Sequence, residues 1–197
     1  MILSVSQLSF FSAEANPPRV GDLAGVLCGP GRAVGFGSGA AVRISLVARD
    51  SWRVCALRGE CAKRQVNADE LRSEEGLPVL RTAFQANLAS LAVHWACDSA
   101  KTAPPEFVPD GAVLRMWALT SGEMTARGYE FELDQDAEHT HRPLWTAANR
   151  AGVGCKLASA PGRGAVLRVT GARRLRRLAE LMGPAPDNAR NAWPSVL

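Results

Sequence analysis

The apolar positions in the first half of the chain alternate between helical and strand-like spacing. Val20–Cys28 is a short apolar run that stops at the helix breakers of residues 29–31, which predicts a short helix. A strand pair follows, and residues 42–47 carry apolar side chains at every second position, typical of a strand with one buried face. The remaining predictions are a helix over Trp52–Val66 with Ser51 as its N-cap, a strand over Leu77–Thr82 and a helix over Leu88–Cys97.

The second half repeats this order of elements. Ala112–Leu119 is an apolar helix that stops at Ser121 and Gly122. Residues 129–134 alternate between apolar and acidic side chains, so they predict another half-buried strand. We further expect a helix over Pro143–Ala151, a hairpin of Val153–Ala158 and Ala165–Val169 around the turn at residues 160–164, and a basic amphipathic helix over Ala172–Met182.

The two halves become copies of one unit, with the order αββαββα, when Gly31 is aligned with Gly122. The predicted fold class is therefore α+β, with two pseudo-symmetric units. We place the first unit at residues 1–99, a linker at 100–110 around the proline-containing segment 102–106, the second unit at 111–185 and a C-terminal tail at 186–197.

Composition is ordinary for a soluble globular protein, since 47% of the 197 residues are hydrophobic and 21% are charged. No stretch approaches the ~18 consecutive apolar residues of a membrane span. Residues 1–5 also lack the features of a secretory leader, so we expect a cytoplasmic protein without membrane contact. The net charge of +4 and the isoelectric point near 9.0 are compatible with a nucleic-acid partner without establishing one.

Neither the cysteines nor the glycine-rich segments form a site with known chemistry. The five cysteines are scattered, with no CxxC pair and no cluster with histidine, so we expect buried reduced thiols, no structural zinc and no cofactor. Residues 35–39 lack the Gly-Lys-Ser/Thr sequence and helix start of a phosphate-binding loop, and are interpreted as a hairpin turn. The cysteines are Cys28, Cys55, Cys61, Cys97 and Cys155.

Residues 23–31, with the sequence LAGVLCGPG, resemble the LAGLIDADG signature of homing endonucleases. The resemblance implies a saddle of antiparallel sheets covered by helices, with two signature helices packed together through small residues. In that family the last acidic residue of the signature binds the catalytic Mg²⁺. Here Pro30 stands at that position, and Ser121 stands there in the second copy, LRMWALTSG, so the resemblance implies no metal site and no catalytic residue. The implied packing residues are Leu23, Ala24, Gly25, Leu27, Met116, Ala118 and Leu119.

Three segments of the second half resemble the WhiA regulators of bacterial sporulation and cell division, which carry a degenerate LAGLIDADG domain. The segments are Trp117–Gly122, Ala147–Lys156 and Val169–Gly183. In the first half Asp22–Gly31 and Gly39–Leu46 fit more loosely, and the whole match covers about residues 5–185. WhiA proteins continue into a helix-turn-helix module, for which no room remains before Leu197, so we expect either a stand-alone relative or the N-terminal part of a longer regulator. The resemblance implies a non-catalytic transcription regulator that binds DNA, a sigma factor of RNA polymerase, or both.

The strand alternation assigns candidate binding residues to faces. Because Val42, Ile44 and Leu46 pack on helices, Arg43 and Arg49 should point toward the saddle. By the same reasoning the residues that alternate with the apolar positions of 129–133 should form an exposed acidic face for a basic partner. That acidic face comprises Glu130, Glu132 and Asp134, and the cationic candidates for nucleic-acid or partner contact are Arg43, Arg49, Lys156, Arg168, Arg173, Arg174 and Arg177.

Two alternatives remain open at this point. The first is an endonuclease with residual cleavage, for which Glu123 is the nearest remaining carboxylate. The second is a structural module that dimerises through small residues such as Ala24 and Gly25. We expect a monomer, because two copies of the unit in one chain can pair with each other.

Overall fold

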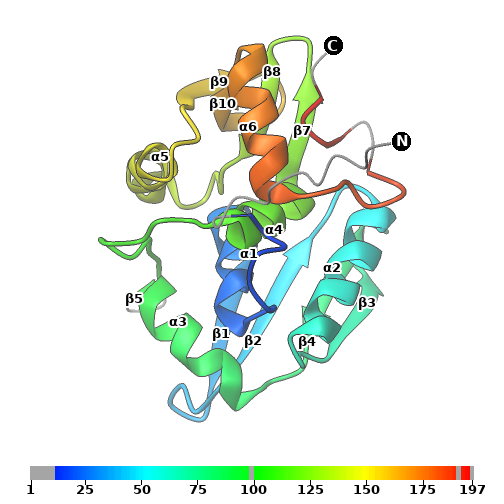
Figure 1. Cartoon of the computed structure of the whole chain (residues 1–197). Helices are drawn as coiled ribbons and strands as arrows, with labels where there is room; N and C mark the ends of the chain where they lie inside the picture. The colour runs from blue at the N-terminus through cyan, green and yellow to red at the C-terminus, as the bar shows by residue number, and fades with distance from the viewer. Residues whose placement is uncertain (1–11, 98–99, 190–191, 196–197) are drawn as a thin grey trace.

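The computed structural model describes residues 12–97, 100–189 and 192–195 (Figure 1). The start of the predicted first unit, its last two residues and parts of the predicted tail therefore lie outside the described residues. The first unit begins with a 3₁₀ turn, η1 (Val20–Leu23), that runs into helix α1 (Ala24–Cys28). It continues with β1 (Arg32–Phe36), β2 (Ala41–Val47), α2 (Ser51–Lys63), β3 (Ala68–Arg72), β4 (Pro78–Thr82), η2 (Ala86–Leu88) and α3 (Ala89–Trp95).

A short hairpin of β5 (Ala96–Cys97) and β6 (Ala100–Lys101) leads to the second unit. Its first helix, α4 (Gly111–Ser121), starts at Asp110, whose side chain accepts a hydrogen bond from the backbone N–H of Val113. The remaining elements are β7 (Gly122–Thr125), β8 (Gly128–Glu132), η3 (Glu138–Thr140), α5 (His141–Arg150), β9 (Lys156–Ala160), β10 (Gly164–Val169) and α6 (Ala172–Met182).

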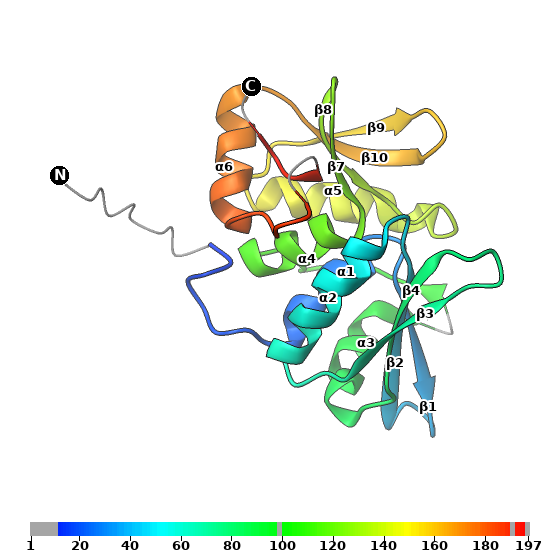
Figure 2. The same ribbon diagram turned by 90° about the vertical axis from the view of Figure 1, so that its right-hand side faces the viewer.

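The two units have the same topology. Each contains a four-stranded antiparallel sheet, with the strand order β1-β2-β4-β3 in the first and the equivalent order β7-β8-β10-β9 in the second. Figure 2 shows α2, α4 and α6 on one side of the molecule and the hairpins β3–β4 and β9–β10 on the other. The predicted α+β class and the repeated αββαββα order are confirmed.

The strand patterns explain which sheet faces are buried. Val42, Ile44 and Leu46 are all at most 2% exposed, and Leu80 of β4 lies opposite Leu46 on the same buried face. In the second unit Tyr129 and Phe131 are buried in the same way. The period-two alternation therefore predicted the core-facing residues of β2 and β8 correctly.

Element ends and two strands differ from the expectations. Asp50, not Ser51, is the N-cap of α2, which ends at Lys63, and α5 starts two residues before Pro143. β3 has the sequence ADELR and only its first residue is half-buried, so it carries no apolar alternation to detect. β7 has four residues and follows α4 directly, so the helical pattern runs into it without a loop.

Helices α1 and α4 pack against each other at the centre of one continuous core (Figure 1). All five residues of α1 are buried. A Cβ atom added to Gly25 would lie 2.2 Å from the carbonyl oxygen of Val113 and 2.6 Å from both Met116 Cβ and Trp117 N. The two backbones therefore approach at a distance that only glycine at position 25 permits.

The expectations from composition hold in part. Cys28, Cys61 and Cys155 are buried free thiols, whereas Cys55 is exposed because it lies on the solvent side of α2. The side chain of Cys97 lies outside the described part of the structure. No helix in the described ranges is long and apolar enough to cross a membrane.

We expect Gly25→Ala to lower the free energy of unfolding by about 1–3 kcal/mol, because the added methyl group overlaps the α4 backbone. Gly59→Ala is the matched control, since Gly59 also lies in a helix and its Cβ would meet no atom within 4 Å. That substitution should be neutral or stabilising by up to about 1 kcal/mol. Urea unfolding measures both, and equal stability of Gly25→Ala and the native protein would contradict close helix packing.

Candidate nucleic-acid interface

In each sheet one face packs on helices and the opposite face is open. The pairing of β1 with β2 places Val34 opposite Arg43 and Arg32 opposite Ser45 on the open face of the first sheet. Arg81 of β4 lies opposite Ser45 on this face as well. The guanidinium of Arg43 lies 4.6 Å from the centroid of the Phe84 ring, so this predicted cation is half-buried against an aromatic side chain.

The open face of the second sheet does not carry the expected exposed acidic residues. Glu130 is only 1% exposed, because Arg163 and Arg168 reach across it. Arg168 Nε lies 2.7 Å from Glu130 Oε1, and Arg163 also binds Glu123 at 2.6 Å. Lys156 lies opposite Arg168 and is exposed. The prediction of an exposed acidic face is wrong here, because arginines of the same sheet neutralise and cover the carboxylate.

Glu132 and Asp134 are bound by cations of the first unit and of the hairpin that follows it. Arg49, which follows β2, places Nη2 2.7 Å from Glu132 Oε2. Glu132 is half-buried, and burial raises its pKa although Arg49 opposes the shift. Asp134 is 4% exposed and binds Lys101, with a weaker contact to Arg32 at 4.0 Å. Both carboxylates therefore hold the two units together and are not a free surface.

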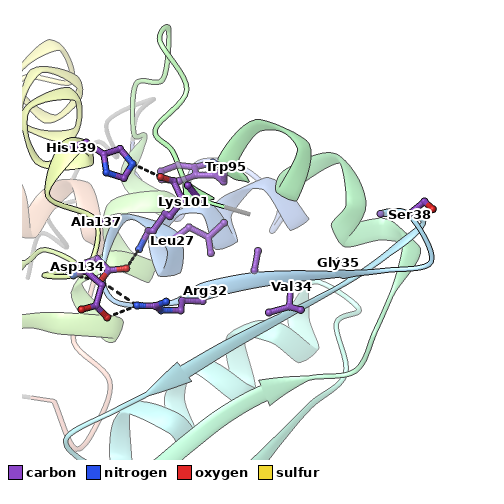
Figure 3. A pocket seen from close by; sticks show the side chains of 14 residues that line it. Leu27, Arg32, Val34, Gly35, Ser38, Trp95, Lys101, Asp134, Ala137 and His139 are labelled. Carbon is purple, nitrogen blue, oxygen red and sulfur yellow. Dashed lines mark hydrogen bonds and ion pairs between the residues drawn. The ribbon is translucent and has the colours of Figure 1, made fainter. Parts of the chain in front are cut away.

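Lys101 binds the carbonyl end of α1. Its Nζ donates to the carbonyl oxygens of Gly29 and Gly31, the latter at 3.0 Å. It also donates to Asp134 Oδ2 at 2.9 Å (Figure 3). The last carbonyl groups of a helix lack partners within the helix and carry partial negative charge, which a cation stabilises. Burial lowers the pKa of Lys101, and the nearby Asp134 carboxylate limits this shift. Burial raises the pKa of Asp134, but Lys101, the backbone N–H of Asp136 and Arg32 together outweigh it, so the pKa is lowered.

Arg53 binds the carbonyl end of α4 in the equivalent way. Its guanidinium donates to the carbonyl oxygens of Ala118 at 3.0 Å, Leu119 at 3.1 Å and Gly122 at 2.7 Å. Arg53 is 6% exposed, and it also binds Asp50 at 3.3 Å and lies 4.6 Å from the centroid of the Trp52 ring. Each of the two central helices therefore ends at a buried cation, and both cations belong to segments before α4.

A cavity of about 750 Å³ lies beside the Lys101 site (Figure 3). Its polar groups bind one another: Lys101 and Arg32 bind Asp134, and His139 Nε2 lies 2.6 Å from the carbonyl oxygen of Lys101. The side chains of Trp95 and Leu27 form apolar parts of the cavity wall. Within the described ranges, no cluster of three or more histidine, cysteine, aspartate or glutamate side chains could hold a metal ion.

The remaining predicted cations lie elsewhere. Arg173, Arg174 and Arg177 are exposed on α6, which packs on α4. In Figure 2 helix α6 lies with α2 and α4, on the side of the molecule away from the hairpins β3–β4 and β9–β10. The structure therefore does not bring them together with Arg43 and Arg49. The predicted packing residues all lie in the core at the α1–α4 contact or beside it: Leu23, Ala24, Gly25, Leu27, Met116, Ala118 and Leu119.

Three contributors to this region, Lys101, Arg53 and Arg163, are absent from the sequence prediction. Lys101 falls in the predicted linker and Arg53 inside a helix, where a cation normally points to solvent. Arg163 lies in a turn between two strands. No local pattern distinguishes these residues, because their partners lie 33 or more positions away along the chain.

We expect Asp134→Asn to lower the free energy of unfolding at neutral pH by about 3 kcal/mol, because it leaves the Lys101 ammonium buried without its carboxylate. Since the pKa of Asp134 is lowered in the folded protein, its stabilising effect is present above the ordinary carboxyl pKa. The difference between the two proteins should therefore shrink as the pH falls from the ordinary carboxyl pKa through the lowered pKa. Urea unfolding across acid and neutral pH measures it, and the single variant Lys101→Met and the double variant Lys101→Met/Asp134→Asn complete a double-mutant cycle. Additive losses in that double variant would contradict a direct pair.

No protein-family model matches the sequence, and no curated protein sequence matches it. Solved structures do. The homing endonuclease I-WcaI bound to its DNA recognition sequence matches with a TM-score of 0.65 at 11% identity, over 98% of this chain and 97% of that one. The N-terminal LAGLIDADG domain of DUF199/WhiA matches with a TM-score of 0.55 at 13% identity, over 92% of this chain and 88% of that one.

Full-length DUF199/WhiA from Thermatoga maritima matches with a TM-score of 0.52 at 14% identity. The match covers 92% of this chain but 58% of the WhiA chain, so this chain spans little more than half of that protein. At such low identities the likenesses concern the fold. Together with the repeated topology and the α1–α4 contact, they show that this chain has a LAGLIDADG-type fold, with both units in one polypeptide.

Proposed function

We propose that this protein binds duplex DNA through a LAGLIDADG scaffold without cleaving it, and that it acts as a transcription regulator or as a domain of one. The observation that carries the absence of cleavage is the pair of cations at the carbonyl ends of α1 and α4, the half-buried Lys101 and the buried Arg53. In a homing endonuclease these helix ends present the metal-binding carboxylates. Here a positively charged side chain, Lys101 or Arg53, binds at each of these helix ends.

The residues at the two signature positions support a non-catalytic role. Mg²⁺ requires oxygen ligands, usually including a carboxylate. Pro30 offers no side-chain ligand, and the hydroxyl of Ser121 donates to the carbonyl oxygen of Glu132 at 3.0 Å. Glu123, the nearest remaining carboxylate, binds Arg163. To bind here, a metal ion would therefore have to displace the hydrogen bond of Ser121 and the ion pair of Glu123, next to the positively charged Arg163.

Duplex DNA is the partner that the scaffold favours. The I-WcaI structure contains its DNA recognition sequence, and this chain aligns over nearly all of that fold. On the open faces, Arg43, Arg49, Lys156 and Arg168 supply cations that can contact phosphates. Arg49 and Arg168 also bind glutamates, so the net attraction is modest and binding should be sensitive to salt.

We expect Lys156→Ala to weaken binding to duplex DNA and to reduce the slope of log affinity against log salt by about 1, because one phosphate contact is lost. Lys63→Ala is the matched control, since Lys63 is an exposed lysine on α2, away from the open sheet faces. Fluorescence anisotropy with a labelled duplex over a salt series measures both.

Two outcomes would contradict the proposed duplex-binding role. One is no binding to any duplex at low salt, and the other is an equal loss in Lys63→Ala. Cleavage of supercoiled plasmid with Mg²⁺ or Mn²⁺, abolished by Glu123→Gln, would instead establish the endonuclease alternative.

Light scattering measures the oligomeric state. We expect a monomer, because Gly25 lets α1 pack against α4 of the same chain.

A sigma factor is our proposed protein partner, and α6 is the proposed contact. In the described part of the chain, Arg173, Arg174 and Arg176 form no ion pair, and Arg177 has only a contact of 3.9 Å with Glu180. This contrasts with the open face of the second sheet, where Arg163 binds its glutamates. An acidic protein surface would supply the missing partners. The fold likeness to WhiA supports this choice of partner.

We expect Arg173→Glu/Arg177→Glu to weaken binding to a purified sigma factor by more than about tenfold, because both substitutions place like charges in the contact. Arg142→Glu is the control, since Arg142 is an exposed arginine on α5. Biolayer interferometry with the organism's sigma factors measures the change. Unchanged binding of the α6 variant, or no binding by the native protein, would remove α6 as the contact.

A further inference from the structure

The open face of the first sheet carries exposed apolar side chains where the second sheet carries charges. Glu123 and Glu130 lie on the open face of β7 and β8, whereas the equivalent strands β1 and β2 present mainly apolar residues there. Phe36 is 67% exposed and Phe84 is 40% exposed. The exposed apolar residues of this face, which we call the aromatic platform, are Val34, Phe36, Val47, Leu71 and Phe84.

Cations are interleaved with the aromatic platform. The rings of Phe36 and Phe84 lie 5.5 Å apart, and the Arg43 guanidinium lies 4.6 Å over the Phe84 ring. Arg81 is exposed two strands away from β1, and among the described residues it forms no ion pair. Arg43 Nε is buried without a hydrogen-bond partner within the same part of the chain. The surface therefore combines stacking faces with cations that are not neutralised.

We infer that the aromatic platform binds single-stranded nucleic acid, with unpaired bases on Phe36 and Phe84 and phosphates on Arg43 and Arg81. A nucleic-acid strand carries both planar bases and phosphates, and this surface places two neighbouring aromatic rings on the same face as guanidinium groups. The inference goes beyond the proposed duplex binding, since it concerns another form of nucleic acid and adds stacking of unpaired bases to the phosphate contacts of Arg43.

Base pairing decides which nucleic acid fits the platform. In a duplex the faces of the bases stack on one another, so only their edges and the phosphates reach a protein. An aromatic side chain therefore stacks most readily on an unpaired base, because both faces of a base inside a duplex are covered. Phe36 immediately precedes the glycine-rich turn of the β1–β2 hairpin, where Gly37, Ser38 and Gly39 all have positive φ angles. Its ring therefore lies at the end of the hairpin, where little else restricts access.

Charge argues against a second copy of the chain as the occupant. Two copies that met through this face would bring Arg43 and Arg81 of each copy together. Asp69 is the one acidic residue on the described strands of this face, so it compensates for little of that repulsion. The same arginines attract a polyanion, and they lie among the apolar residues.

The test is fluorescence anisotropy with labelled oligo-dT, oligo-U and a blunt duplex. The native protein should bind the single-stranded probes, and Phe36→Leu should weaken that binding about tenfold, because it keeps an apolar side chain but removes the ring. Phe36→Trp should restore binding through a larger stacking face. Val93→Ala, which changes an exposed valine on α3, should have no effect.

The single-stranded probes test this inference, and the duplex probe tests the proposed duplex binding, so either can fail without the other. Binding to both single-stranded probes supports recognition of the shared chemistry, and a preference for one identifies DNA or RNA as the ligand. No single-strand binding at low salt overturns the inference, even if the duplex binds. Native-like binding by Phe36→Leu also overturns it, because the platform would then be a general apolar surface suited to a protein partner. Lys156→Ala, which weakens duplex binding, should leave single-strand binding unchanged.

Discussion

The close approach of α1 to α4 is the constraint on which the rest of the structure depends. Gly25 lets the two backbones meet, and the contact buries every residue of α1. Each helix begins a unit, so the pair fixes how the two sheets are placed relative to each other and joins their cores into one. A short helix of five residues has little stability of its own and exists here because tertiary packing surrounds it.

The buried charges at the helix ends follow from this packing. Two helices that end inside the protein leave carbonyl groups away from water, and such groups require partners. Lys101 and Arg53 are those partners, and Asp134 compensates the charge of Lys101. The chain's own cations thereby stabilise the centre of the molecule. In the proposed function the helix ends are structural and the open sheet faces bind the partner.

The two sheets share a topology but differ in surface chemistry. In the second, Arg163 and Arg168 neutralise Glu130, and Lys156 remains exposed. In the first, apolar and aromatic side chains dominate the open face. Repetition of a fold therefore fixes the position of strands and core residues without fixing what each copy binds, because outward-facing residues contribute little to folding.

The sequence by itself determined the order of elements, the strand faces of β2 and β8, and the central position of residues 23–31, because periodicity and helix breakers act locally. It did not reveal β3, whose pattern is polar, or the burial of Glu130 and Asp134, which alternation alone assigned to the surface. Only the tertiary structure decided those, because the arginines and lysine that cover the two carboxylates lie 33 or more residues away and meet them through folding. The alternation of apolar and polar residues predicts on which face of the sheet a side chain lies, whereas the exposure of that side chain depends on which distant residues cover it.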